Sequence, residues 1–123
     1  MTTIDALRAL AARVAPCHLA NKVPTMQPVP YSVLHPSPGV PIDRALCGTS
    51  IDREAVHRLI AVSDKPHTVL RLANLLTDAI DGEGHAGGMF FVEFVSPPLE
   101  DDQDPAGVRW SCTLEIRHHQ YRS

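Results

Sequence analysis

The sequence predicts an α+β fold, a two-layer sandwich in which two helices cover one face of a mainly antiparallel sheet of four or five strands. Residues 63–82 carry apolar residues at helical spacing. Three segments, 54–62, 89–95 and 108–116, alternate apolar and polar residues with the period of two that is typical of strands. Antiparallel strands with helices on one side are an α+β arrangement. The 123 residues fit a single domain, residues 1–123.

The central helix is expected over residues 63–82, because its apolar residues fall on one face. That face carries Val69, Leu72, Ala73, Leu76, Ala79 and Ile80. Ser63 or Asp64 is expected to cap the first turn, and Pro66 fits near the start because its missing N–H needs no partner there. Gly82 is expected to close the helix in the left-handed conformation.

A first helix is expected over residues 3–15, capped by one of the two N-terminal threonines and ended by Pro16. Residues 31–35 have strand propensity and are bounded by prolines, so they are expected to form the first solid strand. Between these elements the prolines leave room for a short edge strand over residues 22–26.

The remaining strands are expected around the central helix. Residues 54–62 lead directly into it, and in residues 89–95 the side chains of Phe90, Val92 and Phe94 are expected to face inward. The inward face of the last strand carries Val108, Trp110, Cys112, Leu114 and Ile116. The last two strands are expected to pair as an antiparallel hairpin.

Three segments are expected to lack regular structure. Residues 36–53 have no period, and a loop of this length is usually functional or disordered. Residues 84–88 are expected to form a flexible turn, and residues 96–107 a solvated acidic loop. The acidic loop carries Glu100, Asp101, Asp102 and Asp104, which are expected to face solvent, DNA or a neighbouring subunit.

Composition narrows the function classes. The net charge of −3 provides no basic footprint for nucleic-acid binding. No apolar run approaches the roughly 20 residues of a membrane span, so we expect no membrane partner. The three cysteines stand at unrelated spacings, which favours reduced thiols in a cytoplasm.

The sequence contains no recognised catalytic or metal-binding motif, and we expect no cofactor, no metal and no catalytic residue. A metal site would need Cys17 and His18 to meet His118 and His119 across the two ends of the chain. The competing interpretation is that these are ordinary surface or core histidines.

A catalytic cysteine paired with a histidine is the other chemistry that the sequence could support. Cys47, before a glycine in the long loop, could be paired with His35 or His57, although nothing in the sequence supplies an oxyanion hole.

One stretch, from Pro30 to Gly82, has a distinctive order of strand, loop, strand and helix. The residues that mark this order are Pro30-Tyr31, Val33-Leu34-His35-Pro36, Gly39, Leu46-Cys47-Gly48, the strand from His57 to Val62, Leu72-Ala73 and Asp81-Gly82. In these features the chain resembles the tail terminator proteins of long-tailed bacteriophages, particularly those that infect actinobacteria. The first helix and last strand also fit that family's layout.

The resemblance implies a virion structural protein without catalytic activity. Tail terminators form a six-membered ring on the head-proximal end of the tail, where they stop polymerisation of the tube. The implied partners are further copies of the chain, the major tail tube protein and the head–tail connector or stopper, while DNA only passes through the lumen. The implied location is the virion, after assembly in the host cytoplasm.

Two groups of side chains are candidates for contacts with other subunits. Val40, Ile42 and Leu46 make the long loop stiff and partly apolar, so it is expected to pack on its own domain or on another chain. Leu70 and Leu75 flank the apolar stripe of the central helix, where they either widen the core contact or touch a neighbour.

Two other functions compete with the tail terminator. One is another head–tail neck component, a stopper or an adaptor. The other is a small cytoplasmic enzyme that uses Cys47 and a histidine, which would lose activity in Cys47→Ala.

Overall fold

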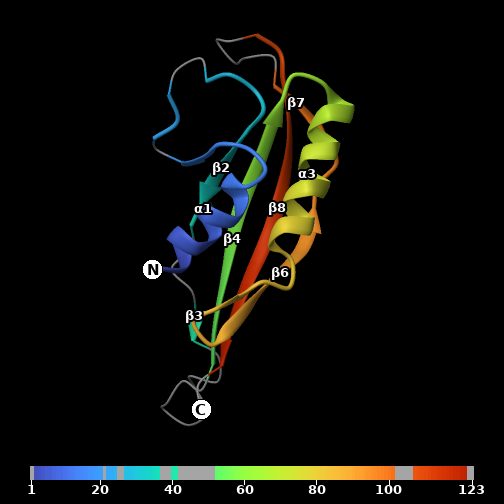
Figure 1. Cartoon of the computed structure of the whole chain (residues 1–123). Coiled ribbons are helices and arrows are strands. Elements are labelled where there is room, and N and C mark those ends of the chain that lie inside the picture. Colours follow the sequence, from blue (N-terminus) through green and yellow to red (C-terminus); the bar gives the residue numbers. More distant parts are fainter. Residues whose placement is uncertain are drawn as a thin grey trace.

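Two helices and eight strands make up the described part of the chain (Figure 1). The computed structural model describes residues 2–20, 22–24, 27–36, 40–41, 52–101 and 107–121, with only the backbone at 40–41, 52–55 and 120–121. The elements are α1 Thr3–Ala12, β1 Cys17–Leu19, β2 Tyr31–His35, β3 Val40–Pro41, β4 Asp52–Ser63, α3 Pro66–Ile80, β5 Gly84–His85, β6 Gly88–Val95, β7 Leu99–Asp101 and β8 Arg109–Tyr121.

All eight strands belong to one sheet. Its order is β1-β2-β4-β8-β6-β5, with β3 added beside β4 and β7 added beside β8. β1 and β2 are parallel, and every other described pair is antiparallel. The prediction of an α+β fold with a mainly antiparallel sheet and two helices is therefore confirmed, but the sheet is larger than the four or five strands expected.

One hydrophobic cluster joins both helices to the sheet. Its largest fully buried members are Leu7 of α1, Leu34 of β2, Leu59 of β4, Leu76 and Ile80 of α3, Phe90 of β6, and Leu114 and Ile116 of β8. Figure 1 shows both helices lying against the same side of the sheet. Burying one large apolar side chain stabilises the fold by roughly 1.5–3 kcal/mol, so this cluster is the main stabilising feature.

α1 is capped as expected and ends early. The Asp5 amide donates a hydrogen bond to Thr2 Oγ1 at 3.1 Å, which satisfies one of the N–H groups at the helix start. The helix ends at Ala12, not near residue 15, because the chain tightens into a turn in which the Val14 amide donates to Ala11 O.

α3 begins at Pro66, and its expected cap is wrong. The N-cap is Lys65, which makes no side-chain cap hydrogen bond. Ser63 is still the last residue of β4, and its hydroxyl lies 2.9 Å from Thr68 Oγ1. The helix end agrees with expectation, since Gly82 has a positive φ of 84°.

The inward face of β6 differs from the predicted one because of a β-bulge. Val92 pairs with Ile116 and Phe94 with Glu115, so Glu93 is an extra residue between them. The side chains beyond the bulge therefore change face. Phe94 is 52% exposed, and Val95 packs against the core instead.

The edges of the sheet also depart from prediction. The expected edge strand at 22–26 is wrong: residues 22–24 form no strand, residues 25–26 lie outside the described part, and the edge strand is β1. The 84–88 turn contains β5, and β8 continues five residues past the predicted end at Ile116. The acidic segment contains β7, and the long loop contains β3.

Candidate functional site

The predicted contact loop is only partly described. Val40 belongs to β3, where its backbone pairs with Glu54 of β4. Ile42 and Leu46 lie outside the described residues, as does Cys47. The contact proposed for this loop stays a prediction.

The predicted acidic residues begin on a strand. Glu100 and Asp101 lie on β7 and are exposed, opposite Trp110 and Arg109 of β8. Asp102 and Asp104 lie outside the described residues. The short strand β7 therefore presents two carboxylates at the edge of the sheet, with the exposed Leu99 beside them.

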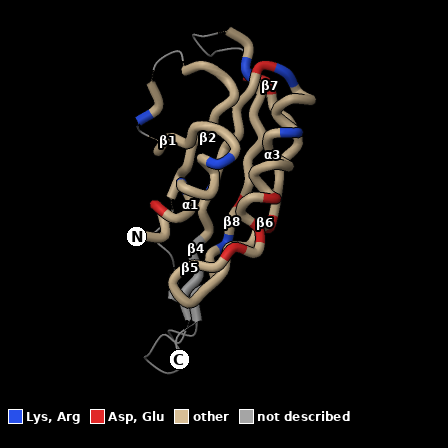
Figure 2. The backbone as a smooth tube through the Cα atoms, in the orientation of Figure 1, with Lys and Arg blue, Asp and Glu red and all other residues tan. Residues whose placement is uncertain are grey.

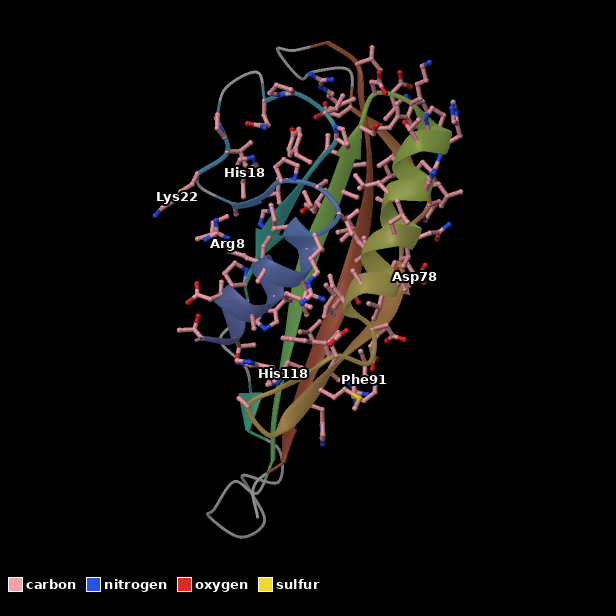
Figure 3. All side chains as sticks on the ribbon, viewed as in Figure 1. Arg8, His18, Lys22, Asp78, Phe91 and His118 are labelled. Carbon is pink, nitrogen blue, oxygen red and sulfur yellow. The ribbon has the colours of Figure 1, made fainter. Side chains whose placement is uncertain are left out.

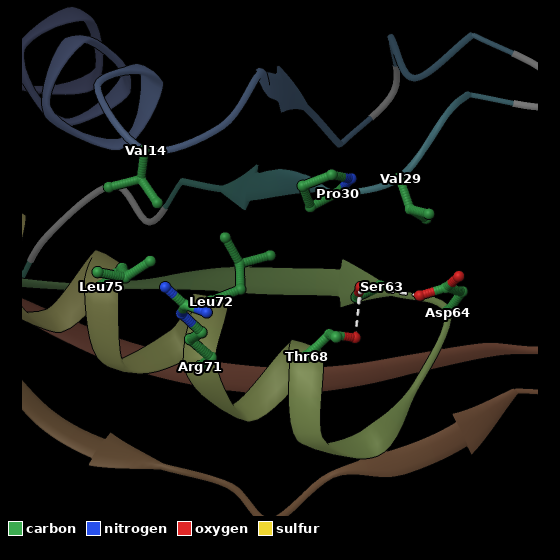
Figure 4. A pocket seen from close by; sticks show the side chains of 9 residues that line it. All are labelled: Val14, Val29, Pro30, Ser63, Asp64, Thr68, Arg71, Leu72 and Leu75. Atoms are coloured by element: carbon green, nitrogen blue, oxygen red, sulfur yellow. Dashed lines mark hydrogen bonds between the residues drawn. The ribbon is translucent and has the colours of Figure 1, made fainter.

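A pocket of about 370 Å³ lies between the residues just after α1, the segment before β2 and the segment that runs from the end of β4 to Leu75 of α3 (Figure 4). Its apolar walls are Val14, Val29, Pro30, Leu72 and Leu75, and its polar members are Ser63, Asp64, Thr68 and Arg71. Sequence periodicity does not reveal this pocket, because its walls come from three separate segments.

The hydroxyl groups in the pocket wall are bonded to one another or to the backbone. Thr68 Oγ1 donates to Lys65 O at 2.9 Å, and Ser63 Oγ lies 2.9 Å from Thr68 Oγ1 and 3.4 Å from Asp64 Oδ1. No ion pair joins Arg71 to another described residue. The Arg71 guanidinium and the exposed Asp64 carboxylate are therefore the charged groups that line this pocket.

No described helix covers the second face of the sheet. Register places Val56, Phe94 and Leu99 there, with exposed fractions of 46%, 52% and 57%. Two ion pairs lie on this face: Glu93 lies 2.7 Å from Arg117, and Arg58 lies 3.9 Å from Glu115. Arg117 also lies over the Phe91 ring, 5.2 Å from its centroid.

Two buried histidines lie on the helix-covered face. His57 on β4 and His118 on β8 are only 2% and 4% exposed. His118, which is labelled in Figure 3, comes from β8. Its Nε2 atom lies 3.0 Å from the carbonyl oxygen of His85, and its ring centroid lies 4.9 Å from that of Phe90. Burial, with a smaller contribution from His118, lowers the pKa of His57, so a neutral imidazole is favoured.

The structure separates the residues considered for a metal site. Cys17 lies in register with Ser32, Ala61 and Cys112 across the sheet, whereas His118 lies opposite Ala55. Six strand positions separate Ala61 from Ala55, about 20 Å at roughly 3.3 Å per residue. Among the described residues, no group of three His, Cys, Asp or Glu side chains is arranged to hold a metal ion.

The two described cysteines are not activated. Burial raises the pKa of Cys112, and it raises that of Cys17 more than the Ser32 hydrogen bond and the Arg8 charge lower it. Thiols with raised pKa values are poor nucleophiles near neutral pH. The two histidines suggested as the base have different surroundings. The side chain of His35 is exposed, whereas that of His57 is buried.

No helix in the described residues has the length and apolar character needed to cross a membrane. No protein-family model matches the chain, and no curated protein matches it.

Proposed function

We propose that this chain is a tail terminator, a virion protein whose copies form a ring that caps the tail tube of a long-tailed bacteriophage. The observation that carries the proposal is that apolar side chains are exposed on two different surfaces. Leu70 and Leu75 are exposed on α3, while Phe94 and Leu99 are exposed on the opposite face of the sheet. A closed ring needs two different contact patches on each copy.

The sequence resemblance supports the same function. The segments of this chain that carry the resemblance form the neighbouring strands β2 and β4 and the helix α3 that follows β4. We take the arrangement of the two helices and the sheet as the two-layer sandwich that the order of helices and strands in the sequence predicts. The net charge of −3 suits a ring through which DNA must slide, because negative walls repel phosphate.

The function can be tested on growing tail tubes. Purified tail tube protein is polymerised with and without this chain, and tube length is measured by electron microscopy. The expected result is a ring at one end of each tube and no further growth from that end. A chain that stays monomeric and neither caps nor co-purifies with tubes would contradict the proposal.

Virions that lack the protein distinguish it from other neck components. Overlong tails are expected for a terminator, since nothing ends tube growth. Tails of normal length beside heads that leak DNA would instead identify a stopper or an adaptor.

A further inference from the structure

The pocket beside α3 carries charges of opposite sign toward its two ends. Asp64 stands two residues before α3, whereas Arg71 lies about 7.5 Å along the helix axis from Pro66. Figure 4 shows the Asp64 carboxylate and the Arg71 guanidinium toward opposite ends of the pocket. Neither group forms an ion pair with another described residue. One pocket therefore offers a negative and a positive group to the same ligand.

The described side chains at the Asp64 end of the pocket accept hydrogen bonds. Thr68 Oγ1 donates its proton to Lys65 O at 2.9 Å, so Ser63 Oγ is the donor in its 2.9 Å contact with Thr68. Both hydroxyl protons are then used, while the oxygen of the buried Ser63 and the Asp64 carboxylate keep lone pairs. Lone pairs beside a negative charge suit an ammonium group, which has three N–H donors and no acceptor.

The other end and the middle of the pocket suit different groups. The Arg71 guanidinium has five N–H donors in a planar fork, which matches a carboxylate. Between the charged ends the wall is apolar, with Leu72 on α3 and Val14, Val29 and Pro30 across from it (Figure 4). A ligand that fills this space therefore has an apolar body between an ammonium and a carboxylate.

The size of the pocket limits the length of that ligand. Its volume of about 370 Å³ is near the lower end of the roughly 300–1,000 Å³ that small-molecule pockets occupy. An extended peptide spans at most about 3.3–3.6 Å per residue, so three residues span about 10 Å. A tripeptide with free termini thus places an ammonium and a carboxylate at a separation comparable to that of the two charged ends.

We propose that this pocket binds a short apolar peptide with free termini. The peptide's ammonium group lies at Ser63 and Asp64, its carboxylate lies at Arg71, and its apolar side chains lie against Leu72 and the opposite wall. A ligand with a single charge would match only one end of the pocket. This binding site goes beyond the proposed ring and does not depend on it.

Three forms of the tripeptide alanyl-leucyl-alanine test the two ends separately. Calorimetric titration measures binding of the free peptide, the N-acetylated peptide and the C-amidated peptide, because acetylation removes the positive charge and amidation the negative one. Salt at about 0.15 M screens charges more than about 8 Å away. Each blocked form is expected to have a dissociation constant about fivefold or more above that of the free peptide, since each loses a charge-assisted hydrogen bond.

Two variants and two matched controls assign the charged ends. Arg71→Gln is expected to bind the free and amidated peptides equally, and Asp64→Asn the free and acetylated peptides equally. Figure 2 colours the charged positions along α3, and the exposed Lys65 and Asp78 do not line the pocket. Lys65→Gln and Asp78→Asn remove the same charges there, so both are expected to discriminate the three peptides like the wild type.

Methyl NMR of the wild-type chain locates the peptide without any variant. The signals of Val14, Val29 and Leu72 are expected to shift on addition of the free peptide. Leu70 is the internal control, since it is 43% exposed on α3 but does not line the pocket, and its signals are expected to stay unchanged.

Several results would overturn this site. They are no saturable binding of the free peptide, equal binding of its three forms, shifts confined to residues outside the pocket, or full discrimination in Arg71→Gln and Asp64→Asn. None of them touches the proposed ring, because capping of tail tubes is measured without peptide. Conversely, a chain that discriminates the three peptides but does not cap tubes keeps this site and loses the proposed function.

Discussion

At the residue scale, two histidine side chains are buried on the helix-covered face of the sheet. His57 and His118 face the same side of neighbouring strands, and His118 is fixed by the His85 carbonyl group and the Phe90 ring. Periodicity places His57 on the same face as Leu59 and Ala61, but it does not indicate that a histidine on that face is buried. Burial is decided by which segments cover the strand.

The buried imidazole of His57 predicts that stability falls as the pH falls. Its pKa is lowered in the folded chain from the usual 6.5, so below about pH 6.5 the unfolded chain binds more protons than the folded one. The free energy of unfolding should therefore decrease from pH 6.5 downward, until the folded imidazole is also protonated. Urea unfolding between pH 7.5 and 5 measures this.

The control for this experiment is an exposed histidine on α3, His67. His57→Asn should flatten the decrease in stability, whereas His67→Asn should keep it. An equally steep decrease in His57→Asn would assign the pH dependence to another group.

At the element scale, the bulge in β6 decides which aromatic side chain reaches the surface. A strict alternation from Phe90 places Phe94 in the core, and the extra residue Glu93 reverses this. The ion pair between Glu93 and Arg117 joins two partly exposed side chains, with exposed fractions of 46% and 33%. Such pairs contribute about 0–1 kcal/mol, so the pair alone does not determine the strand's geometry.

Two deletions in β6 are expected to lower the free energy of unfolding by different amounts. Deleting Glu93 leaves Val92, Phe94 and Val95 on alternate faces, the faces they already have, so it should lower the free energy of unfolding by less than about 2 kcal/mol. Deleting Phe91 makes Phe90 and Val92 adjacent, so one of them must leave the core, at a cost of roughly 3 kcal/mol or more if it is Phe90. Chemical denaturation measures both.

If deleting Glu93 lowered the free energy of unfolding more than deleting Phe91 does, the bulge would not be the cause of the register change.

At the scale of the whole molecule, β4 and β8 form the long central pair of the sheet. They remain in register from Asp52 opposite Tyr121 to Ser63 opposite Trp110, and α3 packs across both. Leu114 of β8 is fully buried between β4 and β6. Truncating it should therefore destabilise the whole described fold and not one edge.

We expect Leu114→Ala to lower the free energy of unfolding by roughly 2–5 kcal/mol, with one cooperative transition seen by both circular dichroism and Trp110 fluorescence. Leu70→Ala is the matched exposed control and should change it by less than about 1 kcal/mol. Both are measured on protein dilute enough to be monomeric. Separate transitions for the two probes would show that the sheet and its edge unfold independently.

The sequence by itself determined both helices, the strands β2, β4, β6 and β8, and the apolar face of α3, because these depend on neighbours two to four residues apart. The sequence also left open whether Leu70 and Leu75 pack against the core or touch a neighbouring subunit, and in the structure both side chains are exposed. Only the tertiary structure decided the bulge, the edge strands β1, β3, β5 and β7, and the pocket beside Leu75. An edge strand exists because a partner strand offers it hydrogen bonds, and a pocket exists because distant segments fail to fill the space between them.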